Sequence, residues 1–141
     1  MKNKILNTSI LFFLFFTLNL FAQELEINSS KIKYDDINKV TILEGNVSSR
    51  DERGNKIFSE YAKYNKLIEL IETKGETKII TSAGYEVFGR DIIFDNRKNL
   101  IYSNNKTKIL DIDGNTVFVD MFNYSILTGI FFFKRKYWNK R

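Results

Sequence analysis

The sequence predicts an all-β protein made of stacked repeats, each 30 residues long (34, 64, 94, 124). Three observations support this: similar residues recur at that fixed interval, apolar and polar residues alternate as in half-buried strands, and the chain has no proline to interrupt a β-ladder. The recurring columns are Tyr34, Tyr64, Phe94 and Tyr124; Ile32, Ala62, Ile92 and Phe122; Val40, Leu70, Leu100 and Ile130; Gly54, Gly84 and Gly114; Ile57, Val87 and Val117; and Phe58, Phe88 and Phe118.

Each repeat is expected to hold about four short antiparallel strands joined by tight turns. Gly and Asn favour such turns because they tolerate positive φ. The first strand of a repeat is followed by Asp35-Asp36, Asn65-Lys66 or Asp95-Asn96, and the last is preceded by a turn centred on Gly54, Gly84 or Gly114. Residues 67–72 have local helix propensity, but the aligned stretches 37–42 and 97–102 do not, so a strand is expected there. One repeat cannot bury its apolar face alone, and neighbouring repeats must stack.

Residues 1–22 have the pattern of a secretory signal peptide. Lys2 and Lys4 give a basic start, residues 10–21 are mostly apolar, and Ala22 offers a small residue for cleavage. An uncleaved anchor is the alternative, but a membrane-spanning helix needs about 20 apolar residues. The chain has no cysteine, which excludes disulfides and a lipoprotein anchor. The mature chain is therefore expected to be exported.

The repeat domain is expected over residues 23–125, followed by a truncated last repeat with a basic tail over 126–141. The fourth repeat begins at Asp120–Tyr124, but its later turn and last strand are missing. Residues 126–133 are strongly apolar instead, and we expect them to form an exposed edge that pairs with another chain. Whether this end is native, or marks the front part of a longer protein, stays open.

The composition argues against a nucleic-acid binder and against an enzyme. The chain has 22 basic and 17 acidic residues, but five of the basic ones lie in the tail, so the repeat domain carries no basic footprint. Without histidine or cysteine it lacks the usual general base, nucleophile and zinc ligands. Asp111–Asn115 is similar to the start of a calcium loop, but Phe122 stands where the twelfth ligand should be, and a turn explains the motif. No catalytic residue, cofactor or metal site is expected.

The repeats resemble the OstA-like family, which includes the lipopolysaccharide-transport protein LptA and the N-terminal domain of LptD. The resemblance covers residues 24–124 and lies in these segments: Ile32-Lys33-Tyr34, Val40 to the Glu44-Gly45-Asn46-Val47 turn, Glu60–Tyr64, Gly84–Gly89 and Arg90–Asp95. Asp120–Tyr124 is more similar to the LptD domain. The resemblance implies an open, twisted antiparallel β-jellyroll.

The resemblance further implies a non-enzymatic periplasmic protein that carries lipopolysaccharide toward the outer membrane. In the family, lipid A acyl chains lie in an apolar groove, and protomers join end to end and to other transport proteins through edge strands. Association with the outer membrane is a further expectation. The expected groove residues are Ile32, Tyr34, Val40, Ile42, Val47, Ala62, Tyr64, Leu70, Ile79, Val87, Ile92, Phe94, Leu100, Tyr102, Ile109, Val117, Phe122 and Tyr124. Glu72 shares a column with Ile42 and Tyr102 and departs from their apolar pattern.

Three other functions compete with a lipid carrier. In a structural adaptor, the inner face is a closed core and only the strand edges bind partners. A fragment of an outer-membrane assembly protein would act in the same way or have no function. An exported carbohydrate-active enzyme would need two carboxylates on one face, and the alternation places no such pair.

Overall fold

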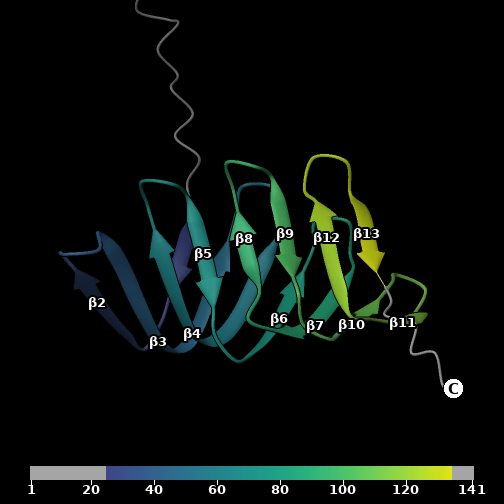
Figure 1. Cartoon of the computed structure of the whole chain (residues 1–141), viewed down its shortest axis with the longest axis horizontal. Helices are drawn as coiled ribbons and strands as arrows, with labels where there is room; N and C mark the ends of the chain where they lie inside the picture. Colours follow the sequence, from purple (N-terminus) through teal and green to yellow (C-terminus); the bar gives the residue numbers. More distant parts are fainter. Residues whose placement is uncertain (1–24, 135–141) are drawn as a thin grey trace, which may run out of the picture.

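The computed structural model describes residues 25–134, which form thirteen β-strands and no helix (Figure 1). The strands are β1 Glu26–Asn28, β2 Lys31–Asp35, β3 Val40–Arg50, β4 Lys56–Asn65, β5 Leu70–Thr73, β6 Glu76–Ile80, β7 Glu86–Arg90, β8 Ile93–Asp95, β9 Leu100–Ser103, β10 Thr107–Leu110, β11 Thr116–Val119, β12 Met121–Ser125 and β13 Ile130–Lys134. The described part of the chain accordingly offers no helix that could cross a membrane. The expected signal peptide and residues 135–141 of the tail lie outside these residues.

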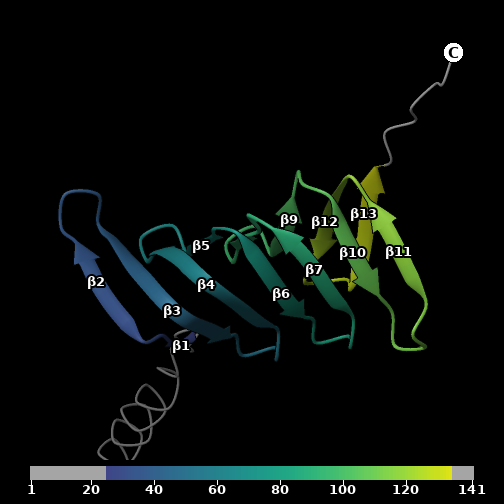
Figure 2. The same ribbon diagram turned by 90° about the horizontal axis from the view of Figure 1, so that it is seen from below.

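All strand pairs are antiparallel, and together they form one sheet folded over on itself. Half-sheet A contains β2, β5, β8, β9, β12 and β13, and half-sheet B contains β1, β6, β7, β10 and β11. The long strands β3 and β4 belong to both. Figure 1 shows β5 to β13 of half-sheet A in a row, and Figure 2 shows β6, β7, β10 and β11 from below. This agrees with the antiparallel β-jellyroll that the resemblance implies.

Two kinds of turn repeat along the chain as predicted. In half-sheet B, the turns over residues 51–55, 81–85 and 111–115 place Gly54, Gly84 and Gly114 at φ values of 83–89°, where glycine meets no steric penalty. In half-sheet A, four-residue turns occupy 36–39, 66–69, 96–99 and 126–129. Asp35 begins the first of these by accepting hydrogen bonds from the backbone N–H groups at positions 37 and 38.

The four-residue turns correct one part of the sequence prediction. Asp35 pairs with Val40 across the first turn, so Tyr34 faces the same side as Thr41 rather than Val40 or Ile42. The other turns shift the alternation in the same way. The inward orientation was therefore wrong for the set Val40, Ile42, Leu70, Leu100 and Tyr102, all of which lie on the outer face. Glu72 also lies outward, opposite Lys63, which explains its departure from the apolar pattern.

One apolar core fills the space between the two half-sheets. It includes buried residues from both, such as Ile71 and Phe94 from half-sheet A and Ile79 and Val87 from half-sheet B. A β-bulge between Glu44 and Val47 bends β3 where it passes from one half-sheet to the other. After β4, the chain passes from one half-sheet to the other through short breaks between consecutive strands, such as the break between β5 and β6.

Candidate functional site

The inner faces of the half-sheets present two apolar rows along the whole array. Residues directly opposite in an antiparallel pair share a face, so the pairing defines each row. The row of half-sheet A is Tyr34, Thr41, Tyr64, Ile71, Phe94, Ile101, Tyr124 and Phe131. The row of half-sheet B is Ile27, Ser49, Ile57, Ile79, Val87, Ile109 and Val117. Neither row contains a charged side chain. We call the space between the inner faces the seam.

Most of the expected groove residues lie in the seam. They are Ile32, Tyr34, Val47, Ala62, Tyr64, Ile79, Val87, Ile92, Phe94, Ile109, Val117, Phe122 and Tyr124. Buried core residues that the sequence interpretation did not include among them are Leu43, Ile57, Ile71, Ile101, Val119 and Ile126. A turn of four residues pairs Ile32 with Leu43, Tyr64 with Ile71 and Phe94 with Ile101. Knowing the length of the turn would therefore have identified Leu43, Ile71 and Ile101 as inward-facing.

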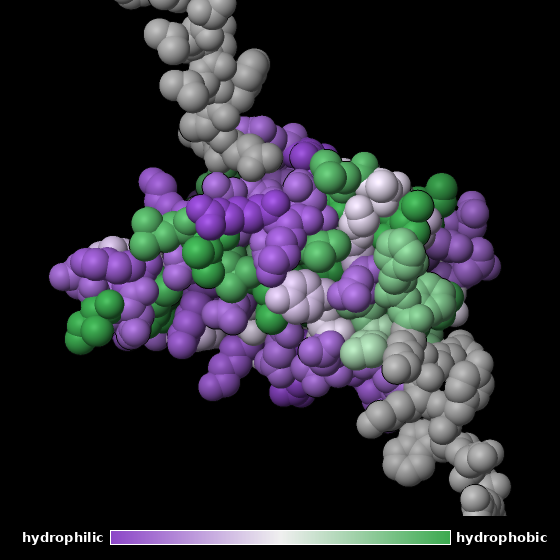
Figure 3. All heavy atoms as spheres, turned by 45° about the horizontal axis from the view of Figure 1, so that its top comes forward, coloured by the Kyte–Doolittle hydropathy of each residue, from purple (hydrophilic) through white to green (hydrophobic). Residues whose placement is uncertain are grey.

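The seam is closed in its middle and exposed at its β2 end. Ala62 and Ile79 are 0% exposed, whereas Ile32 and Tyr34 on β2 are 59% and 62% exposed. At the other end, Phe133 on β13 shares the inner face with Phe122 and is 55% exposed, and Figure 3 shows apolar surface gathered at this end. The described strands thus place unburied apolar side chains at both ends of a continuous apolar interior.

On one long side of the molecule, which we call the turn side, the turns of the two half-sheets meet. The Arg53 guanidinium donates a 2.7 Å hydrogen bond to the side-chain oxygen of Asn99. The Tyr85 ring packs edge-on against Phe131, with 5.0 Å between ring centroids. Both contacts cross between the half-sheets. Arg53 and Tyr85 lie in turns of half-sheet B, whereas Asn99 lies in a turn of half-sheet A and Phe131 on its strand β13.

On the opposite long side, which we call the crossover side, the chain passes between the half-sheets and buried hydroxyls satisfy the backbone. Thr73 Oγ1 donates to the Ile92 carbonyl at 3.0 Å and accepts from the Ile92 N–H at 2.9 Å. Thr77 Oγ1 donates to Thr73 Oγ1 at 2.8 Å. Because these bonds are buried and replace ladder bonds at the breaks, this side holds the half-sheets together more firmly than the exposed Arg53–Asn99 contact does.

Tyr64 is an ionisable residue of the seam whose pKa is changed by burial. Desolvation raises the pKa of the half-buried Tyr64 hydroxyl above 10.0, and the negative charge of Glu69 adds to the effect. The Tyr64 hydroxyl is therefore neutral at physiological pH, and the seam presents an apolar surface with a few hydroxyl groups.

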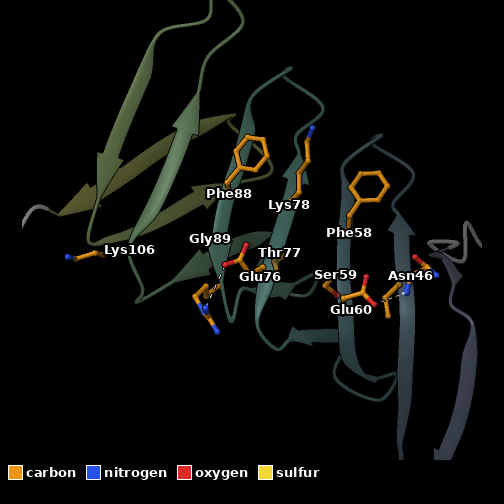
Figure 4. Close-up of a pocket in the computed structure, with 12 residues that line it drawn as sticks. Asn46, Phe58, Ser59, Glu60, Glu76, Thr77, Lys78, Phe88, Gly89 and Lys106 are labelled. Carbon is orange, nitrogen blue, oxygen red and sulfur yellow. Dashed lines mark hydrogen bonds and ion pairs between the residues drawn. The ribbon is translucent and has the colours of Figure 1, made fainter.

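A separate hollow of about 640 Å³ lies on the outer face of half-sheet B. Phe58, Lys78 and Phe88 line it and face away from the seam, because their neighbours in each strand face inward. The Lys78 amino group lies 5.1 Å from the centroid of the Phe88 ring, and Figure 4 shows these side chains with the Glu76–Arg90 ion pair beside them. The sequence identified the Phe58–Phe88–Phe118 column as a repeat marker but not as part of an outer surface.

The acidic turn at Asp111 is held by its own hydrogen bonds. The Asp111 carboxylate accepts from the backbone and the side chain of Asn115, both at 2.8 Å. Within residues 25–134, no three His, Cys, Asp or Glu side chains lie close enough together to hold a metal ion.

No protein-family model and no curated protein sequence matches this chain. Among solved structures, it is similar to the crystal structure of LptH, described as the LptA-homologous periplasmic component of the lipopolysaccharide transport device of Pseudomonas aeruginosa. The TM-score is 0.69 at 16% sequence identity, over 84% of this chain and 87% of LptH. This chain has the LptA-like β-jellyroll fold. The resemblance to the OstA-like family is thereby confirmed at the level of the fold.

Proposed function

We propose that this chain is a non-enzymatic periplasmic component of lipopolysaccharide transport, which binds acyl chains in the seam and passes the lipid toward the outer membrane. The LptA-like fold supports the general role, since LptH is described as a periplasmic part of such a transport device. The acyl-chain site is inferred from this chain's own inner faces.

The observation that carries the proposal is the continuity of the two uncharged apolar rows, one from β2 to β13 and the other from β1 to β11, with Ile32 and Tyr34 exposed at one end. An acyl chain entering the seam would gain about 0.8 kcal/mol for each buried CH₂ group. Phosphates and sugars would stay outside, because an unpaired charge in an apolar interior is very costly.

Entry of a chain requires the half-sheets to move apart on the turn side. There the Arg53–Asn99 hydrogen bond is exposed to solvent and so contributes little stability. The buried hydroxyl network of Thr73 and Thr77 favours the crossover side as the hinge. Acyl chains would thus enter laterally, with their head groups along the turn side.

The test is site-specific photocrosslinking to purified lipopolysaccharide. A benzophenone amino acid replaces Tyr34 or Phe94 in the seam and, as matched outward controls, Lys33 or Tyr102. We expect crosslinks from the two seam positions and few from the controls. Equal crosslinking from both faces would contradict binding in the seam.

A second candidate is a structural adaptor that acts through its strand edges. Within residues 25–134, β2 pairs only with β3 and β13 pairs only with β12, so each end of the array offers an unpaired edge. Such edges bind further strands readily. An adaptor would form complexes through these edges while showing none of the seam crosslinks described above.

A further inference from the structure

The Tyr124 side chain is buried in the seam with its hydroxyl unpaired. The residue is 1% exposed, and no hydrogen-bond partner for this hydroxyl is found among the described residues. The ring packs against Phe131 at a centroid distance of 4.6 Å. The hydroxyl points to the turn side, since a methyl group built on Gly129 would lie 3.9 Å from it.

Other buried hydroxyls in this protein have partners. Thr73 and Thr77 bond to each other, the Ser103 hydroxyl donates to the Arg90 carbonyl at 2.9 Å, and Thr107 donates to the Asn105 carbonyl at 2.8 Å. An unpaired buried hydroxyl is unfavourable because its hydrogen bonds to water are lost on folding and not replaced. The fold therefore pairs its buried hydroxyls as a rule, and Tyr124 departs from that rule.

Packing alone does not require a hydroxyl at this position. Phe94 occupies the same column of the preceding repeat, lies in the same inner row and is equally buried, at 2% exposed. A phenylalanine ring thus fills the equivalent space without a polar group. The hydroxyl of Tyr124 has no structural task in the described residues, which points to a ligand group as its partner.

The surroundings define the chemistry of that partner. Phe131 packs on the Tyr124 ring, and Phe122 and Tyr85 pack in turn on Phe131, so this cluster is aromatic and its members carry no positive charge. A phosphate or carboxylate would be desolvated there without a cation. A neutral acceptor attached to an apolar chain fits, and an ester or amide carbonyl lies where an acyl chain leaves the seam for its polar head group.

We propose that the Tyr124 hydroxyl donates a hydrogen bond to the ester or amide carbonyl of an acyl chain held at the β13 end of the seam. This inference rests on the proposed function, since it names the polar contact within the same site. Phe131 covers the position from β13, the last strand described, and is only half-buried. Rotation of its ring would admit the chain beside Tyr124.

The experiment compares the wild type with Tyr124→Phe, which removes only the hydroxyl. Tyr102→Phe is the control, because this tyrosine lies one strand away on the outer face. Each protein is titrated with methyl tetradecanoate, carrying a ¹³C-labelled carbonyl, and with tetradecane, which has no oxygen, both delivered from cyclodextrin. Purified lipopolysaccharide is the third ligand. Melting temperature without ligand and the infrared carbonyl band of the bound ester are measured as well.

We expect Tyr124→Phe to bind the ester roughly three- to tenfold more weakly, the value of one net hydrogen bond, and to bind tetradecane unchanged. The carbonyl band of the ester should shift to lower frequency in the wild type and in Tyr102→Phe, but not in Tyr124→Phe. The ligand-free variant should melt at a higher temperature than the wild type, because the unpaired hydroxyl is gone.

Two results would overturn the inference. If Tyr124→Phe binds the ester as tightly as the wild type does, the hydroxyl makes no contact with it. If Tyr124→Phe melts at a lower temperature than the wild type, and the carbonyl band of the bound ester has the same frequency in both proteins, the hydroxyl has a structural role. Failure of the wild type to bind lipopolysaccharide, ester or alkane would instead refute the proposed function, and this inference with it.

Discussion

The Arg53 side chain donates a 2.7 Å hydrogen bond to Asn99, a residue 46 positions later in the chain. Arg53 belongs to a turn of half-sheet B and Asn99 to a turn of half-sheet A, so this bond spans the turn side. It is exposed to solvent, and the free energy of breaking it is small compared with that of opening the crossover side.

Replacing Arg53 with alanine should ease separation of the half-sheets. We expect faster hydrogen exchange in turns 51–55 and 96–99, faster uptake of lipopolysaccharide, and a decrease of about 0.5–1.5 kcal/mol in the free energy of unfolding. Arg97→Ala is the control, since Arg97 is an exposed arginine in the facing turn. Unchanged uptake and exchange in Arg53→Ala would show that this contact does not restrict opening.

The corrected face assignment predicts opposite results for two adjacent residues. Ile71 is 2% exposed in the core, so Ile71→Ala should lower the free energy of unfolding by about 2–5 kcal/mol. Glu72 faces outward opposite Lys63, so Glu72→Leu should change it by no more than about 0.5 kcal/mol. Urea unfolding followed by circular dichroism measures both, and a larger effect at Glu72 than at Ile71 would reverse the assignment.

Two repeat glycines test the turn geometry. Gly84 and Gly114 have φ values of 86° and 83°, so alanine at either position should cost about 1–2 kcal/mol of stability. A Cβ at Gly84 would also lie 2.8 Å from Cγ2 of Ile112, while at Gly114 it meets nothing within 4 Å. Gly84→Ala should therefore be the more destabilising by about 0.5–1.5 kcal/mol, the cost of displacing the Ile112 side chain from its rotamer. Equal melting temperatures for the two variants would contradict this.

The Asp111 turn should add stability only above acid pH. The hydrogen bond from the Asn115 side chain has the largest effect on the pKa of Asp111 and lowers it below 3.8; desolvation opposes this, and hydrogen bonds from backbone N–H groups lower the pKa further. Because the pKa is lowered on folding, the carboxylate stabilises the fold above its unfolded pKa, and this contribution is lost as pH falls through the folded value.

Asp111→Asn should thus be less stable than the wild type near neutral pH and similar to it at the acid end of a series of urea titrations between pH 7 and pH 2. Asp113→Asn is the control, because it leaves the Asp111–Asn115 bonds intact. A stability difference for Asp111→Asn that does not depend on pH would exclude the carboxylate charge as its cause.

The repeat, the strand content and the positions of the turns could be predicted from sequence because glycine columns and two-residue alternation are local signals. Which residues of a strand face inward could not be predicted beyond a turn, because this depends on the number of residues in the turn. Four turn residues place Tyr34 with Thr41, and the assumption of unbroken alternation put Val40 and Ile42 in the seam instead.

Contacts across the seam could not be predicted from the sequence for a different reason. The Arg53–Asn99 bond and the unpaired Tyr124 hydroxyl depend on how the two half-sheets close, and residues so far apart in the chain carry no common pattern. The Tyr34–Tyr64–Phe94–Tyr124 column was visible from the start, but nothing in it distinguished the tyrosine that lacks a partner.

Strands β3 and β4, of 11 and 10 residues, run through both half-sheets, whereas each later strand ends at the crossover side. The β3–β4 pair continues through the bend on both sides of its β-bulge, so the angle between the half-sheets is more restricted near the N-terminal repeat and is freer to widen with each repeat toward β13. A lipid would consequently meet a tapered channel, narrow where β3 and β4 pair and most compliant beside Phe131.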